Sequence, residues 1–178
     1  MEALIAASGP EVLIVGLGPM GMGYGHRLSM SGKYNVYGYD KVIADEGASA
    51  NEMREAAAKK GITPITDYAE MRKIFSGLRQ KIILSVPENA VDDVLKGLEP
   101  HLRKFAIIMD CTNSFYKDTG RRAAHYAGGF VSYIGIGVSG GVDGEKDGYC
   151  LMYRTSPDDA AFVDPIMKEL AGHDVQQL

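Results

Sequence analysis

Residues 11–23, EVLIVGLGPMGMG, decide the fold of this 178-residue chain. The apolar run 12–15 is typical of a short strand that is buried on both faces. Three glycines follow with the spacing G-x-G-x-x-G, at Gly16, Gly18 and Gly21. In a strand–turn–helix unit the first permits a tight turn, the second lets a pyrophosphate approach the backbone, and the third lets the helix pack against the strand. The stretch therefore predicts a dinucleotide-binding turn.

The flanking sequence supports this interpretation. Pro19 stands where a first helical residue is expected, and the helix-like segment 20–30 follows it. The free N–H groups and the positive dipole end of that helix would face the phosphates. A second apolar strand, 36–40, ends in Asp40, about 20 residues past the glycines, where a carboxylate is expected for the ribose hydroxyls. The alternative is a glycine-rich turn of another α/β fold, in which Asp40 is an ordinary turn residue.

Composition and charge narrow the class of protein. Hydrophobic residues make up 46% of the chain, which is enough for one sizeable core. No apolar run approaches the length that spans a bilayer. The formal net charge of −4 argues against a nucleic-acid or membrane-surface partner. Cys111 and Cys150 fit neither a disulfide framework nor a metal site. We therefore expect a reduced, cytoplasmic protein without a metal, in which both cysteines are core residues.

Strand and helix patterns alternate along the chain, which is typical of a parallel sheet with crossover helices. Beyond the first two strands, the expected strands are 62–65, 81–86, 105–109, 130–134 and 149–153. The expected helices are 20–30, 48–60, 67–75, 89–98, 117–126 and 158–171. A polar loop is expected after Asp40, and a glycine-rich loop over 135–148. This order predicts an α/β fold of Rossmann type, a doubly wound, mostly parallel sheet with helices on both faces.

The loops at the carboxyl ends of the strands carry the expected site, because ligands of open α/β sheets bind there. These loops are 16–21, 40–41, 86–89, 110–114 and 135–148. We expect them to line one crevice.

Three motifs resemble one known family. Residues 16–21, followed by Arg27 and Leu28, resemble the G-L-G-x-M-G…R-L opening of the 6-phosphogluconate and 3-hydroxyisobutyrate dehydrogenase superfamily. Residues 110–118, DCTNSFYKD, resemble the D-G-G-N-S-x-Y-x-D motif of 6-phosphogluconate dehydrogenases. Residues 137–152 resemble their G-V-S-G-G-x-x-G…G-Y-C-L-M, in the form of the decarboxylating type. The resemblance implies an N-terminal NAD(P)-binding Rossmann domain over 11–178, after a leader at residues 1–10.

The resemblance also implies a role for each matching residue. The implied cofactor-binding residues are Gly16, Leu17, Gly18, Pro19, Met20, Gly21, Asp40, Lys41, Val86, Pro87 and Asn113. Asn113 would also contact the substrate, together with Ser139, Gly140 and Gly141. An asparagine amide offers donors and an acceptor, and a Ser-Gly-Gly turn offers unobstructed N–H groups. The alternatives are a helix cap at Asn113 and Ser114 for the segment that begins at Lys117, and a plain loop at 139–141.

Two departures from the family pattern matter. Cys111 and Thr112 replace the family's paired glycines before Asn113, which crowds that loop. The family's Lys general base and its K-x-x-H-N-G-x-E helix, which holds the Glu general acid, fall after Leu178. No catalytic residue is therefore expected in this chain. We expect the cofactor-binding domain alone, without the helical C-terminal domain that makes the family's homodimer.

The implied function is that of an oxidoreductase, which oxidises a sugar-acid hydroxyl by hydride transfer to NAD(P), with decarboxylation. The alternatives are a non-decarboxylating 3-hydroxyacid dehydrogenase of the 3-hydroxyisobutyrate type and a non-catalytic dinucleotide-binding module. Asp40 favours NAD over NADP, because a carboxylate repels a 2′-phosphate, although Lys41 beside it weakens this preference. The implied partner is a small hydroxyacid or a phosphorylated sugar acid.

Overall fold

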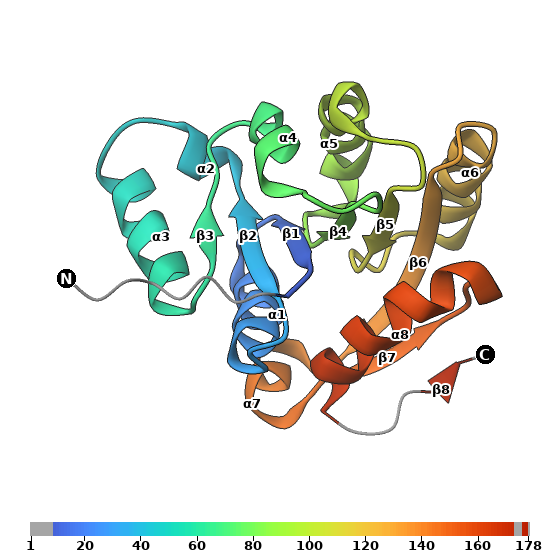
Figure 1. Ribbon diagram of the computed structural model, residues 1–178. Coiled ribbons are helices and arrows are strands. Elements are labelled where there is room, and N and C mark those ends of the chain that lie inside the picture. Colours follow the sequence, from blue (N-terminus) through green and yellow to red (C-terminus); the bar gives the residue numbers. More distant parts are fainter. Residues whose placement is uncertain (1–8, 173–175, 178) are drawn as a thin grey trace.

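The computed structural model describes residues 9–172 and 176–177, and these form a single mixed sheet with helices on both faces (Figure 1). The strands are β1 (Glu11–Val15), β2 (Asn35–Tyr39), β3 (Thr63–Pro64), β4 (Lys81–Leu84), β5 (Ile107–Asp110), β6 (Ser132–Ser139), β7 (Cys150–Tyr153) and β8 (Gln176–Gln177). Their order in the sheet is β3-β2-β1-β4-β5-β6-β7-β8. Every pair from β3 to β6 is parallel, whereas β7 runs antiparallel to β6. The predicted mostly parallel, doubly wound sheet is confirmed.

Two layers of helix cover the sheet. The α-helices are α1 (Pro19–Met30), α2 (Lys41–Ala44), α3 (Ala48–Lys59), α4 (Met71–Ile74), α5 (Val91–Leu98), α6 (Tyr116–Ala127), α7 (Gly144–Asp147) and α8 (Pro157–Ala171). Short 3-10 turns lie at Tyr68–Glu70, Glu88–Ala90, Glu99–His101 and Gly141–Asp143. Apolar residues of α1, α3 and α8 join one buried cluster, and those of α4, α5 and α6 join a second one on the opposite face. Figure 1 shows these two layers on either side of the strands.

Strand β1 occupies the middle of the sheet and illustrates why the sequence folds this way. Val12 and Ile14 belong to one buried cluster, and Leu13 and Val15 belong to the other. All four side chains are at most 1% exposed. Because each such side chain contributes about 1.5–3 kcal/mol when it leaves water, an unbroken apolar run is stable only where both faces are covered.

The last helix of the described chain returns to the first. Arg27 of α1 donates from Nε to the carbonyl oxygen of Glu169 in α8 at 3.0 Å, and from Nη1 to that of Glu145 in α7 at 3.2 Å. Both acceptors are carbonyl groups near the ends of their helices, where the α-helical hydrogen-bond pattern leaves oxygens without partners. One guanidinium therefore joins α1, α7 and α8.

Several sequence-based expectations need correction. The polar loop expected after Asp40 is the short helix α2, because the Asp40 carboxylate accepts from the Val42 N–H and caps it. The glycine-rich loop expected over 135–148 is ordered: β6 continues to Ser139, and the Gly141–Asp143 turn and α7 follow. A side chain at Gly135 would lie 2.5 Å from Thr119, so this glycine permits α6 to lie close against β6.

Cys150 is exposed, whereas a core position was expected. It lies on β7, where exposed and buried side chains alternate, and its side chain points to the uncovered face. Cys111 is buried, as expected. Of the predicted leader, residues 1–8 lie outside the described residues, and the carbonyl groups of Gly9 and Pro10 accept hydrogen bonds from Asn35.

Candidate functional site: the carboxyl-end edge of the sheet

The three glycines after β1 differ in what surrounds them. Gly16 has φ +93°, and a Cβ there would lie 2.3 Å from the carbonyl oxygen of Ser85, just after β4. A Cβ on Gly21 would lie 1.8 Å from the carbonyl oxygen of Gly16. A Cβ on Gly18 would have no atom within 4 Å. Gly16 and Gly21 are thus required by backbone packing, whereas Gly18 borders open space.

Helix α1 begins at this open space. Gly18 is its N-cap residue, Pro19 is in the first turn, and no side chain caps the helix. The first turn also holds no acidic residue. Within this 12-residue helix, therefore, neither a side-chain cap nor an acidic residue of the first turn offsets the partial positive charge at its start, which favours an anion there.

Asp40 links the glycine turn to the end of β2. Its Oδ2 accepts from the Leu17 N–H at 2.9 Å, and its Oδ1 accepts from the Val42 N–H at 3.0 Å. Each carboxylate oxygen has a second lone-pair direction, so these bonds leave acceptor capacity for further donors. The carboxylate therefore holds the glycine turn in place while it remains able to accept from a hydroxyl.

A cleft of about 540 Å³ opens between the carboxyl ends of β1, β2 and β4. Chain order reverses between β1 and β4, and such a switch point is where ligands of open sheets bind. The predicted residues that line the cleft are Gly16, Gly18, Asp40, Lys41, Val86 and Pro87. Of the others in this part of the sequence, Leu17 is buried in the core, and Gly21 packs against Gly16.

Sequence reasoning missed the aromatic wall of this cleft. Tyr39 and Tyr68 line it with their ring centroids 4.2 Å apart, and a Cβ on Gly97 would lie 3.1 Å from the Tyr68 ring. The lining is completed by Val15, Ser85, Asn89, Ala90, Asp93 and Val94. The position of Tyr68, just after Asp67 and the short strand β3, was the available signal, since β3 pairs with β2 beside the cleft.

The loop after β5 is held by its own polar side chains. Asp110 is 2% exposed, and its carboxylate accepts from the Thr112 N–H and Oγ1 and from the Tyr133 hydroxyl. Asp110 thus fixes its own loop. Cys111 packs into the core, where burial raises the pKa of its thiol, so it is not prepared to act as a nucleophile.

Asn113 joins this loop to the end of β6. Its Nδ2 donates to the Val138 carbonyl oxygen and its Oδ1 accepts from the Val138 N–H, both at 2.9 Å. Asn113 also lines a separate hollow of about 280 Å³ together with Asp110, Ser114, Tyr116, Thr119 and 135–137. Ser139, Gly140 and Gly141 follow Val138 directly and are exposed. The edge therefore has two parts, the β1–β2–β4 cleft and the hollow beside β5 and β6. Asn113 lines the second, whereas Ser139, Gly140 and Gly141 line neither.

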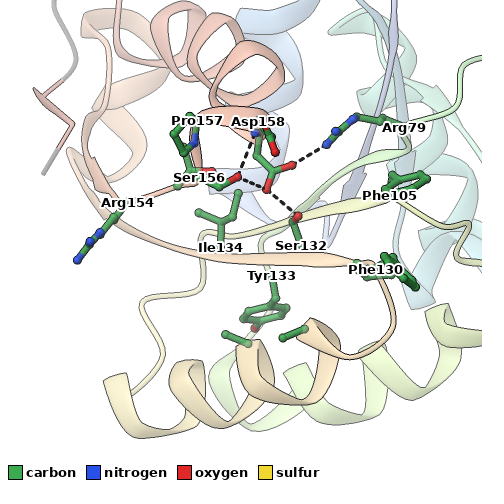
Figure 2. A pocket seen from close by; sticks show the side chains of 15 residues that line it. Arg79, Phe105, Phe130, Ser132, Tyr133, Ile134, Arg154, Ser156, Pro157 and Asp158 are labelled. Carbon is green, nitrogen blue, oxygen red and sulfur yellow. Dashed lines mark hydrogen bonds and ion pairs between the residues drawn. The ribbon is translucent and has the colours of Figure 1, made fainter.

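A larger hollow, of about 670 Å³, lies at the opposite edge of the sheet, where β5 and β6 begin. Figure 2 shows Arg79, Ser132 and Ser156 converging there on one carboxylate. That carboxylate belongs to Asp159, which accepts from Arg79 at 2.6 Å, from Ser132 at 2.7 Å and from Ser156 at 2.9 Å. These groups satisfy one another and anchor α8 to the sheet, so we do not take this hollow as the candidate site.

Within residues 9–172 and 176–177, no group of three or more His, Cys, Asp or Glu side chains could hold a metal ion. No helix in this described part of the chain has the length and apolar character of a membrane span.

The parallel sheet, the glycine turn under an uncapped helix and the cleft at the switch point define a dinucleotide-binding domain of Rossmann type. The family model for the NAD binding domain of 6-phosphogluconate dehydrogenase matches residues 11–177. The chain belongs to this family.

Individual relatives agree with this assignment. The chain is 30% identical over 162 residues to the decarboxylating 6-phosphogluconate dehydrogenase of Bacillus licheniformis, and 26% identical over 161 residues to an NADP(+)-dependent one of Bacillus subtilis. The matches cover 89% and 90% of this chain and 33% of each relative, so the chain spans about a third of their length. Among solved structures, 3-hydroxyisobutyrate dehydrogenase from Mycobacterium tuberculosis has the same fold, with a TM-score of 0.77 at 18% identity, over 95% of this chain and 54% of the other.

Proposed function

We propose that this chain binds NAD(P) at the carboxyl-end edge as the cofactor domain of a dehydrogenase that acts on a sugar acid. One observation carries the proposal: Gly18 borders open space at the start of α1 while Asp40 stands across the turn with acceptor capacity to spare. The uncapped N–H groups of α1 would hold the pyrophosphate, and Asp40 would accept from the adenosine ribose. Val86 and Pro87 would lie beside the nicotinamide-side ribose.

The experiment that tests cofactor binding is a calorimetric titration of the chain with NAD and NADP. Gly18→Val adds a side chain where the pyrophosphate would lie, and the open surroundings should leave the fold intact. We expect NAD binding to be lost in this variant. Gly77→Val is the matched control, because a Cβ at Gly77 also meets no atom within 4 Å. Unchanged affinity in folded Gly18→Val would overturn the proposal.

Cofactor choice is a second part of the proposal. The Asp40 carboxylate would repel a 2′-phosphate and accept hydrogen bonds from a free diol, so we propose that NAD binds more tightly than NADP. Asp40→Ala should narrow the difference between the affinities for NAD and NADP. Lys41→Ala should change this difference by less. Tighter binding of NADP than of NAD by the unmutated chain would contradict this preference.

The proposed reaction of the whole protein is oxidation of the 3-hydroxyl of a sugar acid, followed by loss of carbon dioxide from the β-keto acid. A bound nicotinamide supplies the hydride acceptor. Asn113 and the Ser139–Gly140–Gly141 turn would orient the hydroxyl and carboxylate of the substrate with amide, hydroxyl and N–H groups. Neither Asn113 nor Ser139 can act as a base near neutral pH.

Asp110 is occupied by three donor groups, and Lys117 and Asp143 are exposed. We therefore propose that the 178-residue chain binds the cofactor without turning over 6-phosphogluconate. Steady NADH formation by the purified chain that is lost in Lys117→Ala or Asp110→Asn would contradict this.

A further inference from the structure

Four side chains form a hydrogen-bond chain beneath Asn113, and its direction can be assigned. Arg122 of α6 can only donate, so Ser114 Oγ accepts from its Nη1 at 3.0 Å. The proton of Ser114 is then free to be donated to Thr112 Oγ1, 2.7 Å away. Thr112 in turn donates its own proton to Asp110 Oδ1 at 2.5 Å. Every donor therefore points from the guanidinium toward the Asp110 carboxylate.

This series of hydrogen bonds joins two buried charged side chains. Arg122 is 4% exposed and Asp110 is 2% exposed. Buried charges are costly unless they are paired or fully hydrogen-bonded. Arg122 also donates from Nε to Asp92 of α5 at 2.8 Å, and Asp110 also accepts from Tyr133 of β6 at 2.6 Å. The two hydroxyl groups of Thr112 and Ser114 complete the connection between the guanidinium and the carboxylate.

Asn113 lies between the two hydroxyl residues and has φ +54°, in the left-handed region that Asn adopts more readily than most other non-glycine residues. With Thr112 and Ser114 both tied to the Asp110–Arg122 pair, the side chain of Asn113 reaches the Val138 peptide, which it holds at both its N–H and its carbonyl oxygen. Val138 immediately precedes Ser139 and Gly140. Asn113 thus holds one side of the main chain at Val138, at the start of the exposed turn, while β7 pairs with the other side.

We infer that Thr112 is a positioning residue, whose hydroxyl holds Asn113 and the Val138–Gly141 segment in the arrangement that receives the nicotinamide half of the cofactor and the substrate. This inference rests on the proposed function for the identity of the ligand. Thr112 stands at one of the two positions where the resemblance places paired glycines. Its hydroxyl supplies a hydrogen bond that a glycine cannot. This bond offsets the crowding that the larger threonine side chain causes in the loop.

Thr112→Val removes the hydroxyl and keeps the shape of the side chain. Affinities for NADH and for AMP, each measured by calorimetry, separate the two halves of the edge, because in the proposed binding mode AMP would reach only the β1–β2–β4 cleft. We expect Thr112→Val to weaken NADH binding by about 3- to 10-fold, the equivalent of one hydrogen bond, and AMP binding by less than about twofold. Thr112→Ser should restore NADH binding. Ser76→Ala is the matched control, since Ser76 Oγ also donates to a carboxylate, that of Glu11 at 2.5 Å, and Glu11 begins β1 at the opposite end of the sheet.

A second readout needs no cofactor. Hydrogen exchange followed by nuclear magnetic resonance should show a slowly exchanging Asn113 side-chain amide and Val138 N–H in the unmutated chain and in Thr112→Ser. Exchange at both groups should be at least about tenfold faster in Thr112→Val and in Ser114→Ala, beyond any change in global unfolding.

The outcomes distinguish this inference from the proposed function. Equal NADH-to-AMP affinity ratios in Thr112→Val and the unmutated chain, or unchanged exchange at Asn113 and Val138, would overturn the positioning role and leave cofactor binding intact. A chain that binds neither NADH nor AMP would overturn the proposed function, and the exchange measurement would still decide whether Thr112 positions Asn113.

Discussion

The loop after β1 and the loop after β5 lie at the same edge of the sheet, yet they are built in opposite ways. The first is shaped by absent side chains, because a Cβ at Gly16 or Gly21 would overlap a backbone carbonyl oxygen. The second is shaped by side chains that are present, since Asp110, Thr112 and Ser114 hold one another. The difference teaches that an open glycine turn and a rigid polar support call for different residue types, even at the same edge of one sheet.

The strongest way to break the first loop is Gly21→Ala. The new Cβ would lie 1.8 Å from the Gly16 carbonyl oxygen, so either α1 or the turn after β1 must shift. We expect a loss of about 3 kcal/mol in the free energy of unfolding, typical of severe overpacking. Urea denaturation measures it, and Gly18→Ala, which meets no atom within 4 Å, should stay within about 0.5 kcal/mol. Equal stability of the two variants would show that the backbone of α1 at Gly21 and that of the turn at Gly16 are not in close contact.

An intermediate effect is expected in the second loop from Asp110→Asn. An amide keeps the shape of the carboxylate but turns an NH₂ group toward a donor, either Thr112 or Tyr133. It also removes the negative charge that ends the series of hydrogen bonds starting at Arg122. We expect a loss of about 2 kcal/mol in the free energy of unfolding, measured by urea denaturation. Asp158→Asn is the control, because Asp158 is exposed. A free energy of unfolding equal to that of the control would mean that the charge of Asp110 does not stabilise the fold.

The smallest effect concerns Asp92, which receives Arg122 at the outer end of the same support. The hydrogen bond from Arg122, strengthened by Arg121, lowers the pKa of Asp92 to about 2. Because the folded pKa lies below the unfolded value of about 3.9, the contribution of Asp92 to stability is present above the unfolded pKa and is lost as the pH falls through the folded one. Asp92→Asn should therefore be less stable than the unmutated chain near neutral pH, with a gap that closes between about pH 4 and pH 2.

Asp93→Asn is the matched control for this pH dependence. Asp93 is the next residue on α5, its side chain is 84% exposed, and it pairs with Lys96 at 3.2 Å. The difference in stability between Asp93→Asn and the unmutated chain, measured by thermal denaturation at several pH values, should be smaller and should change less with pH. A constant gap for Asp92→Asn from pH 7 to pH 2 would rule out the ion pair as its cause.

The two loops also differ in how far the sequence predicts them. A strand pattern, a glycine spacing and a proline within residues 11–21 were sufficient to predict the turn, the helix start at Pro19 and the opening at Gly18, although Asp40 and Ser85 also contact this loop. The second loop depends on Arg122, Tyr133 and Val138, which lie 8 to 25 residues away from their partners in the sequence. No local pattern records those contacts, and they follow only from the packing of α6 and β6 beside β5.

The same reason explains where the fold was predicted and where it was not. Runs that are buried on both faces, such as β1, have a local signature. The end of β6, the helix α7 and the exposure of Cys150 depend on β7 turning back antiparallel to β6 at the Ser139–Cys150 pair, which glycine content alone does not indicate. Tyr68 was missed in a similar way, because it reaches the cleft by packing on Tyr39 and beside Gly97.

The bonds from Arg27 to α7 and α8 have a consequence for the order of events at the ribosome. The helix that starts at the glycine turn emerges among the first 30 residues, but the carbonyl groups that hold its guanidinium belong to Glu145 and Glu169. A nascent chain that has released only its first half can pair β1 with β2 and β4, yet its α1 still lacks the helices that fix it. The fixing of α1 is therefore completed only after α7 and α8 leave the exit tunnel, and a stalled chain would present the Arg27 guanidinium without these two acceptors.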